Sequence, residues 1–158
     1  MSTDLLLLDL QGFRDYKNRF IIKELAYATK EYTQVYLVKP PYPFSKLSDD
    51  EKKQVKWLER NRGIYWRQGY IDYNEFSRLI KPVLDKANVF VKGSEKCKWL
   101  RELSPDCKVL DIGERGCPNL KSLFDSYQGN DKICCFNHQK YCALKTVICL
   151  RKWYYNDY

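Results

Sequence analysis

Three residues near the end of the chain have the types and the spacing of metal ligands. Two residues separate Cys135 from His138, the only histidine, and three separate His138 from Cys142. A turn followed by one helical turn could therefore aim two sulfurs and an imidazole at one point. Thiolate and imidazole are the usual ligands of structural zinc, which takes four of them in a tetrahedron. We expect Cys117, in the turn Gly116-Cys117-Pro118, to be the fourth ligand of a Zn²⁺ ion.

The residue types alone leave alternatives to this zinc site. Cysteine is among the most buried residue types even without a metal, and a lone histidine is often only a core group. Cys134 could also replace its neighbour Cys135 as the ligand. Disulfides are disfavoured because the cysteine count is odd, at seven, and because the first residues do not resemble a signal peptide. We therefore expect an intracellular protein, cytoplasmic or nuclear, where clustered thiols favour metal over bridges.

The elements that would position these ligands begin with strands. Leu5 to Leu10 is a nearly continuous apolar run closed by Gln11-Gly12, a pattern typical of a central strand covered on both faces. The next two apolar segments follow at hairpin distance. We expect five strands in all, at 5–10, 20–28, 34–38, 89–91 and 108–112.

Helices are expected between and after these strands. Ser48 with Glu51 three residues on makes a capping box, and Asp72 with Glu75 repeats the pattern. Ser94 is expected to cap the following helix. The expected helices run from 49 to 60, after Asp72, after Ser94, around 120–126 and from 139 to about 155. This order predicts an α/β fold with two crossover connections, in a single domain over residues 1–158.

The expected central strand carries a motif that resembles a known one. Leu8-Asp9-Leu10-Gln11-Gly12-Phe13 resembles the first motif of the DEDD exonucleases, in which this strand carries Asp-x-Glu. The order of elements is similar to that of the ribonuclease H-like fold over nearly the whole chain. The resemblance is closest to the degenerate, zinc-bearing branch typified by the Maelstrom domain. It implies a mixed five-stranded sheet, three antiparallel strands and then two parallel ones, flanked by helices, with a zinc-binding segment at 117–142.

Departures from the exonuclease motifs predict an inactive protein. Two-metal phosphodiester hydrolysis needs several carboxylates to hold both Mg²⁺ ions and the attacking water. Of the four carboxylates in that family, the resemblance matches only Asp9. Gln11 stands at the position of the motif's glutamate, and Lys96 lies near the position of the second-motif aspartate. Cys142 lies near the position of the family's last carboxylate. Because a neutral amide and an ammonium cannot substitute for these carboxylates, we expect a pseudo-exonuclease.

A different metal site is a third-ranked alternative. Asp111 and Glu114 follow the fifth strand and could in principle join Asp9 in a metal-dependent nuclease. In the simpler interpretation, Asp9 accepts hydrogen bonds from nearby backbone amides at a strand end. The carboxylates of Asp111 and Glu114 are then solvated loop residues.

Charge and aromatic content favour a polyanionic partner. The chain has 28 Lys and Arg against 20 Asp and Glu, a formal charge of +8, and 15 % aromatic residues. Basic and aromatic residues are interleaved in two segments. The residues expected to bind RNA or single-stranded nucleic acid are Tyr65, Trp66, Arg67, Tyr70, Arg151, Lys152 and Trp153. Each of these rings could equally be packed in the core.

A protein-interaction scaffold on the same fold is the main alternative. Its docking segment would be the proline-rich stretch 39–44. No apolar run is long enough to cross a bilayer, so no membrane partner is expected.

Overall fold

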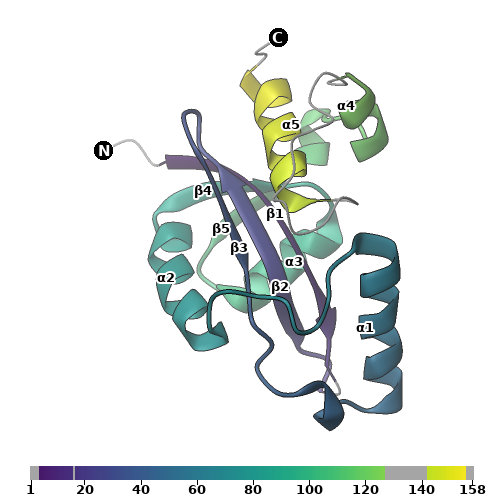
Figure 1. Ribbon diagram of the computed structural model, residues 1–158. Helices are drawn as coiled ribbons and strands as arrows, with labels where there is room; N and C mark the ends of the chain where they lie inside the picture. The colour runs from purple at the N-terminus through teal and green to yellow at the C-terminus, as the bar shows by residue number, and fades with distance from the viewer. Residues whose placement is uncertain (1–3, 16, 127–141, 156–158) are drawn as a thin grey trace.

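The computed structural model describes residues 4–15, 17–126 and 142–155, and Figure 1 shows their arrangement. The strands are β1 (Asp4–Arg14), β2 (Phe20–Ala28), β3 (Thr33–Leu37), β4 (Ala87–Val91) and β5 (Lys108–Asp111). The helices are α1 (Asp49–Arg62), α2 (Tyr73–Asp85), α3 (Ser94–Leu103), α4 (Leu120–Ser126) and α5 (Ala143–Tyr155). Two short 3-10 helices are η1 (Phe44–Lys46) and η2 (Ile112–Arg115).

Strand β1 lies at the centre of a five-stranded sheet with the order β3-β2-β1-β4-β5. β2 runs antiparallel to β1 and to β3, whereas β4 is parallel to β1 and β5 is parallel to β4. Parallel neighbours need crossover connections, which here run through α1 and α2 before β4 and through α3 before β5. The predicted mixed sheet with a central first strand is confirmed.

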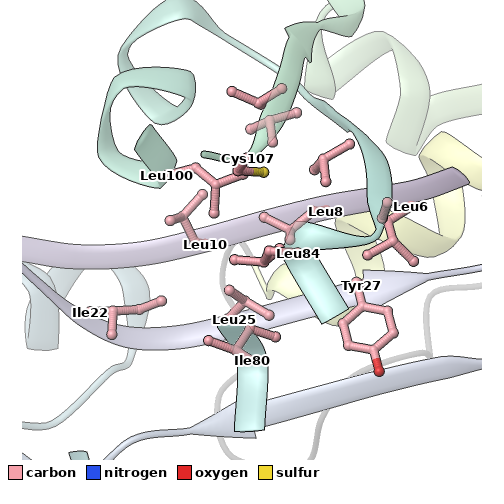
Figure 2. Close-up of a cluster of buried hydrophobic side chains, with 14 of the residues drawn as sticks. Leu6, Leu8, Leu10, Ile22, Leu25, Tyr27, Ile80, Leu84, Leu100 and Cys107 are labelled. Atoms are coloured by element: carbon pink, nitrogen blue, oxygen red, sulfur yellow. The ribbon is translucent and has the colours of Figure 1, made fainter. Parts of the chain in front are cut away.

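Helices α2 and α3 cover one face of this sheet (Figure 1). Side chains alternate between the faces along a strand, so Leu6, Leu8 and Leu10 share this face. Figure 2 shows Leu8 and Leu10 in the same buried cluster as Leu84 of α2 and Leu100 of α3. The packing of helices over this strand explains its run of leucines.

Helix α5 covers part of the other face, onto which Asp9 and Gln11 of β1 project. Ala26 of β2 packs in one buried cluster with Ala143 and Val147 of α5. The small side chains let the helix lie close to the sheet. The two polar residues of β1 are therefore enclosed between the sheet and a helix.

Strand β1 continues beyond Gln11-Gly12, where the sequence predicted its end. Its register with β2 shifts between these two residues, which is a β-bulge. A Cβ atom at Gly12 would lie 2.2 Å from the carbonyl oxygen of Ile21, so only glycine allows this approach. Beyond the bulge, Phe13 packs in a cluster with Val55 of α1. Helix α1 therefore covers the hairpin end of the face that α5 also covers.

Helix starts match the predictions in part. Ser48 and Glu51 exchange side-chain and backbone hydrogen bonds, so the first capping box is confirmed. Asp72 occupies the N-cap position of α2, but its side chain makes no capping hydrogen bond, so the second capping box is not formed. Ser94 is the first residue of α3 rather than its cap, because the preceding glycine takes the N-cap position with a φ of 103°.

The last helix is described from Ala143 onward. Residues 139–141, where the sequence predicts its start, lie outside the described residues. Among the helices that the structure describes, none is both long and apolar enough to span a membrane.

Candidate functional site

The carboxylate of Asp9 and the ammonium of Lys96 form an ion pair at one end of the sheet. Nζ of Lys96 lies 2.6 Å from Oδ1 of Asp9, and the two residues are 87 positions apart in the chain. Lys96 belongs to the first turn of α3, just after β4, and β4 pairs with the central strand that carries Asp9. The Asp9 side chain is 3 % exposed and the Lys96 side chain 24 % exposed. A lysine thus supplies the positive charge beside the buried Asp9 carboxylate.

The pKa of the Asp9 carboxyl is raised above its ordinary value by burial, because the charged form loses its hydration. The Lys96 ammonium opposes this effect, as do hydrogen bonds from the Thr146 side chain and the Leu10 backbone. Since Lys96 already supplies the positive charge at this carboxylate, little negative charge is left for a divalent cation.

Gln11 and Glu24 extend the polar cluster beneath the start of α5. Nε2 of Gln11 donates to Oε1 of Glu24 over 3.2 Å, and the amide of Ala143 donates to the same oxygen over 3.1 Å. Glu24 is fully buried and accepts a hydrogen bond from one of the backbone amides that a helix start leaves without a partner inside the helix. Sequence analysis missed Glu24. The available signal in the sequence was the charged pair Lys23-Glu24 inside the otherwise apolar segment 20–28, which was expected to be a strand.

Asp111 holds together the loops that follow β4 and β5. Its Oδ1 atom accepts hydrogen bonds from the amides of Gly93 and Gly113, over 2.9 and 2.8 Å. Within the described residues, no group of three or more His, Cys, Asp or Glu side chains could hold a metal ion. Asp9, Asp111 and Glu114 therefore do not form the alternative metal site, and Asp111 instead binds backbone donors.

The predicted zinc ligands are described only in part. Cys135 and His138 lie outside the described residues, as does the alternative ligand Cys134. Cys117 and Cys142 are both buried, and burial raises the pKa of the Cys117 thiol. The other described cysteines are also buried, and they are Cys97, Cys107 and Cys149. The zinc site stays a prediction.

The first basic and aromatic segment lies in the loop between α1 and α2. Arg67 is exposed, and so is Tyr65, at 51 %. Trp66 is only 4 % exposed, and its ring centroid lies 4.9 Å from that of Phe13. Trp66 is therefore a core residue that closes the cluster under α1, and its predicted role in stacking on a base is wrong. Tyr70 exposes its ring, while its hydroxyl donates to a carbonyl oxygen of β3.

The second basic and aromatic segment lies on α5. Trp153 is half-buried and packs against the apolar cluster that contains Leu7. Nη1 of Arg151 donates to the carbonyl oxygen of Thr29 over 3.3 Å, and Lys152 is half-buried. Helix α5 packs over the Leu7 end of β1 and α1 over the hairpin end (Figure 1). The two segments therefore do not merge into one surface.

A buried lysine holds the first segment in place. Nζ of Lys23 donates to the carbonyl oxygens of Val38, Trp66 and Gln68, over 2.8, 2.8 and 2.7 Å. These three bonds use every hydrogen of the ammonium and join the loop to the sheet. Burial lowers the pKa of Lys23 to about 7. Sequence analysis missed Lys23 as well, although it belongs to the same charged pair as Glu24.

Comparison with known proteins does not assign this chain to a family. No protein-family model matches it, and no curated protein matches it in sequence. Its function has to be inferred from the residues and contacts described above.

Proposed function

We propose that this chain is a catalytically inactive protein of the ribonuclease H-like fold, resembling the DEDD exonucleases. Its function in this proposal is to bind RNA or single-stranded nucleic acid through a basic surface. The strand order β3-β2-β1-β4-β5 supports the fold part of the proposal, because three antiparallel strands precede two parallel ones around a central β1. The lack of a carboxylate cluster among the described residues supports the inactive part.

The ion pair between Asp9 and Lys96 is the observation that carries the proposal. A two-metal nuclease keeps its carboxylates open to two Mg²⁺ ions and a water molecule. Here the carboxylate is 3 % exposed and a lysine ammonium contacts it at 2.6 Å. Gln11, at the position of the motif's glutamate, donates a hydrogen bond to Glu24. The site is thus filled with protein contacts that stabilise the fold.

Nucleic-acid binding is supported by charge and exposure. The formal charge of +8 attracts a polyanion, and Arg67, Tyr65 and Tyr70 reach solvent. The scaffold alternative is less well supported. Tyr42 and Phe44, the aromatic residues of its docking segment, are half-buried and pack against the cluster that contains Trp66. Their rings face the core, whereas a docking segment would present them to a partner.

A structural Zn²⁺ ion is part of the proposal. Cys117, Cys135, His138 and Cys142 would hold it, and three thiolates with one imidazole are a donor set that suits zinc. Four protein ligands leave no open position for water. The metal would therefore join the start of α5 to the turn after β5 without taking part in a reaction.

Fluorescence anisotropy with a labelled single-stranded RNA tests the proposed function. We expect a dissociation constant of ~10⁻⁴ to 10⁻⁶ M near physiological salt, because phosphate contacts release counterions. The affinity should fall steeply between about 50 and 200 mM salt. No binding at the lower salt concentration, or binding that ignores salt, would favour the protein scaffold.

A further inference from the structure

A groove lies between residues 39–45, helix α1 and the loop that follows α1. Its volume is about 650 Å³, and its lining includes Lys39, Phe44, Lys52 and Arg67. A second hollow of about 310 Å³ shares Phe44, Trp66 and Arg67 with the first, and it adds Lys56, Glu59 and Tyr65. Because they share lining residues, the two hollows are adjacent, and we call them together the basic groove.

The charges around the basic groove favour an anion. Three cations, Lys39, Lys52 and Arg67, line the larger hollow, and no described carboxylate does. The smaller hollow adds one cation, Lys56, and one carboxylate, Glu59, so cations outnumber carboxylates over the whole groove. Lys39 lies 3.9 Å from Asp72, but both side chains are more than half exposed, so this pair is weak. Among the described residues, Lys52 and Arg67 have no carboxylate within 4.0 Å. These charges converge on one hollow and attract a ligand with more than one negative group.

Aromatic rings lie beside these cations. The Lys52 ammonium lies 5.6 Å from the centroid of the half-buried Phe44 ring. Tyr65, in the smaller hollow, is 51 % exposed and stands next to Arg67. The exposed Tyr65 ring beside these cations suits a chain in which phosphates alternate with bases, because a ring can stack on any base.

The walls of the groove are held rigidly, which lowers the entropy cost of binding. The Lys23 ammonium fixes the carbonyl oxygens of Trp66 and Gln68 on either side of Arg67. Gly69 has a φ of 150°, and a Cβ atom there would lie 2.5 Å from the Lys39 amide nitrogen. The loop therefore packs tightly against the segment that carries Lys39, and a larger residue at Gly69 would separate them.

We infer that the basic groove is the binding site for a single strand of nucleic acid. Phosphates would lie against Lys39, Lys52 and Arg67, and a base would stack on Tyr65. This inference rests on the proposed function and goes further, because it assigns binding to one groove and excludes α5. The arginine and tryptophan of α5 are occupied by contacts within the fold.

Two charge-reversal variants of the full chain separate this site from overall charge. Lys52→Glu with Arg67→Glu alters the groove. Lys53→Glu with Arg60→Glu is the matched control, since it changes the net charge equally at two exposed residues that do not line either hollow. Anisotropy is measured with fluorescein-labelled oligo(U) and oligo(dT) of about 15 nucleotides, long enough for the site sizes of single-strand binders.

The groove variant should bind both oligonucleotides at least roughly tenfold more weakly, and its salt slope should fall by about two, one for each lost phosphate contact. The control should keep the wild-type slope. An equal loss in both variants would overturn the groove inference and leave the proposed function standing. If the wild-type chain binds neither oligonucleotide at low salt, both fail.

Tyr65→Ala adds a test that does not change the charge. It should weaken binding by roughly 5- to 100-fold without changing the salt slope, because stacking releases no counterions. Circular dichroism melting shows whether each variant is folded. If Tyr65→Ala and Lys52→Gln with Arg67→Gln are folded and bind as tightly as the wild type, the groove is not the site.

Discussion

Oδ1 of Asp9 lies 2.6 Å from Nζ of Lys96, yet the two side chains differ in exposure, with 3 % for Asp9 and 24 % for Lys96. The pair joins the central strand to the first turn of α3. The buried Asp9 carboxylate needs the Lys96 ammonium to balance its charge. The Lys96 ammonium, by contrast, can be hydrated by solvent if Asp9 is removed. Removing one partner is therefore not equivalent to removing the other.

Replacing Lys96 should destabilise the fold more than replacing Asp9. Lys96→Met leaves a buried carboxylate without its cation and should lower the free energy of unfolding by about 3 kcal/mol at neutral pH. Asp9→Asn should have a smaller effect, because the ammonium turns to solvent. Urea denaturation of both variants measures the difference. Equal losses would mean that the pair does not hold Asp9 in its charged form.

The loss of unfolding free energy caused by Lys96→Met should depend on pH. Without the lysine, burial raises the pKa of Asp9 with less opposition, so folding favours the protonated form. When the pKa of a carboxyl is higher in the folded than in the unfolded protein, the free energy of unfolding decreases as pH rises toward the folded pKa. The variant should therefore approach the wild type in stability as pH falls from neutral toward 5. Adding Asp9→Asn to Lys96→Met is the control that should remove this pH dependence.

Lys23 should make stability rise with pH. Burial lowers its pKa from 10.5 to about 7, so between these values the unfolded chain binds more protons than the folded chain. The cost of burying the ammonium is complete below pH 7 and is relieved as pH rises toward 10.5. Urea denaturation of the wild type and Lys23→Met from pH 6 to 9.5 measures this. The wild type should gain stability relative to the variant above pH 7, and parallel profiles would contradict the lowered pKa.

Zinc should be bound at about one ion per chain. Binding free energy for a structural zinc is folding free energy, on the order of 10 kcal/mol, so chelation should lower the midpoint of thermal unfolding strongly. Elemental analysis of Cys135→Ser and His138→Ala should show the metal lost. Cys107→Ala is the control, because Cys107 is buried in the apolar cluster under α2 and α3 and is not one of the proposed ligands. Purified protein without zinc would contradict the prediction.

Sequence patterns predicted those parts of the fold that depend on residues close to one another in the sequence. The run from Leu5 to Leu10 indicated a central strand, and Ser48 with Glu51 indicated a helix start, because each signal lies within one turn or strand. The extension of β1 was missed, since the bulge at Gly12 depends on the closeness of Ile21 in the next strand.

The candidate site was predicted less completely, because it joins distant parts of the chain. The motif comparison placed Lys96 near the position of the second-motif aspartate, but only the fold of the chain between them brings its ammonium into contact with Asp9. The burial of Trp66 depends on Phe13, which lies on another element. Glu24 forms part of the site through α5, whose start is more than a hundred residues away in sequence.

Nuclease activity tests the central claim most directly. Labelled single-stranded RNA and DNA are incubated with the purified protein in Mg²⁺ or Mn²⁺, and their lengths are followed by denaturing gel electrophoresis. Because Asp9 is paired with Lys96 and no described carboxylate cluster could hold two metal ions, both substrates should stay intact. Degradation that is lost in Asp9→Asn would contradict the inactive-nuclease account.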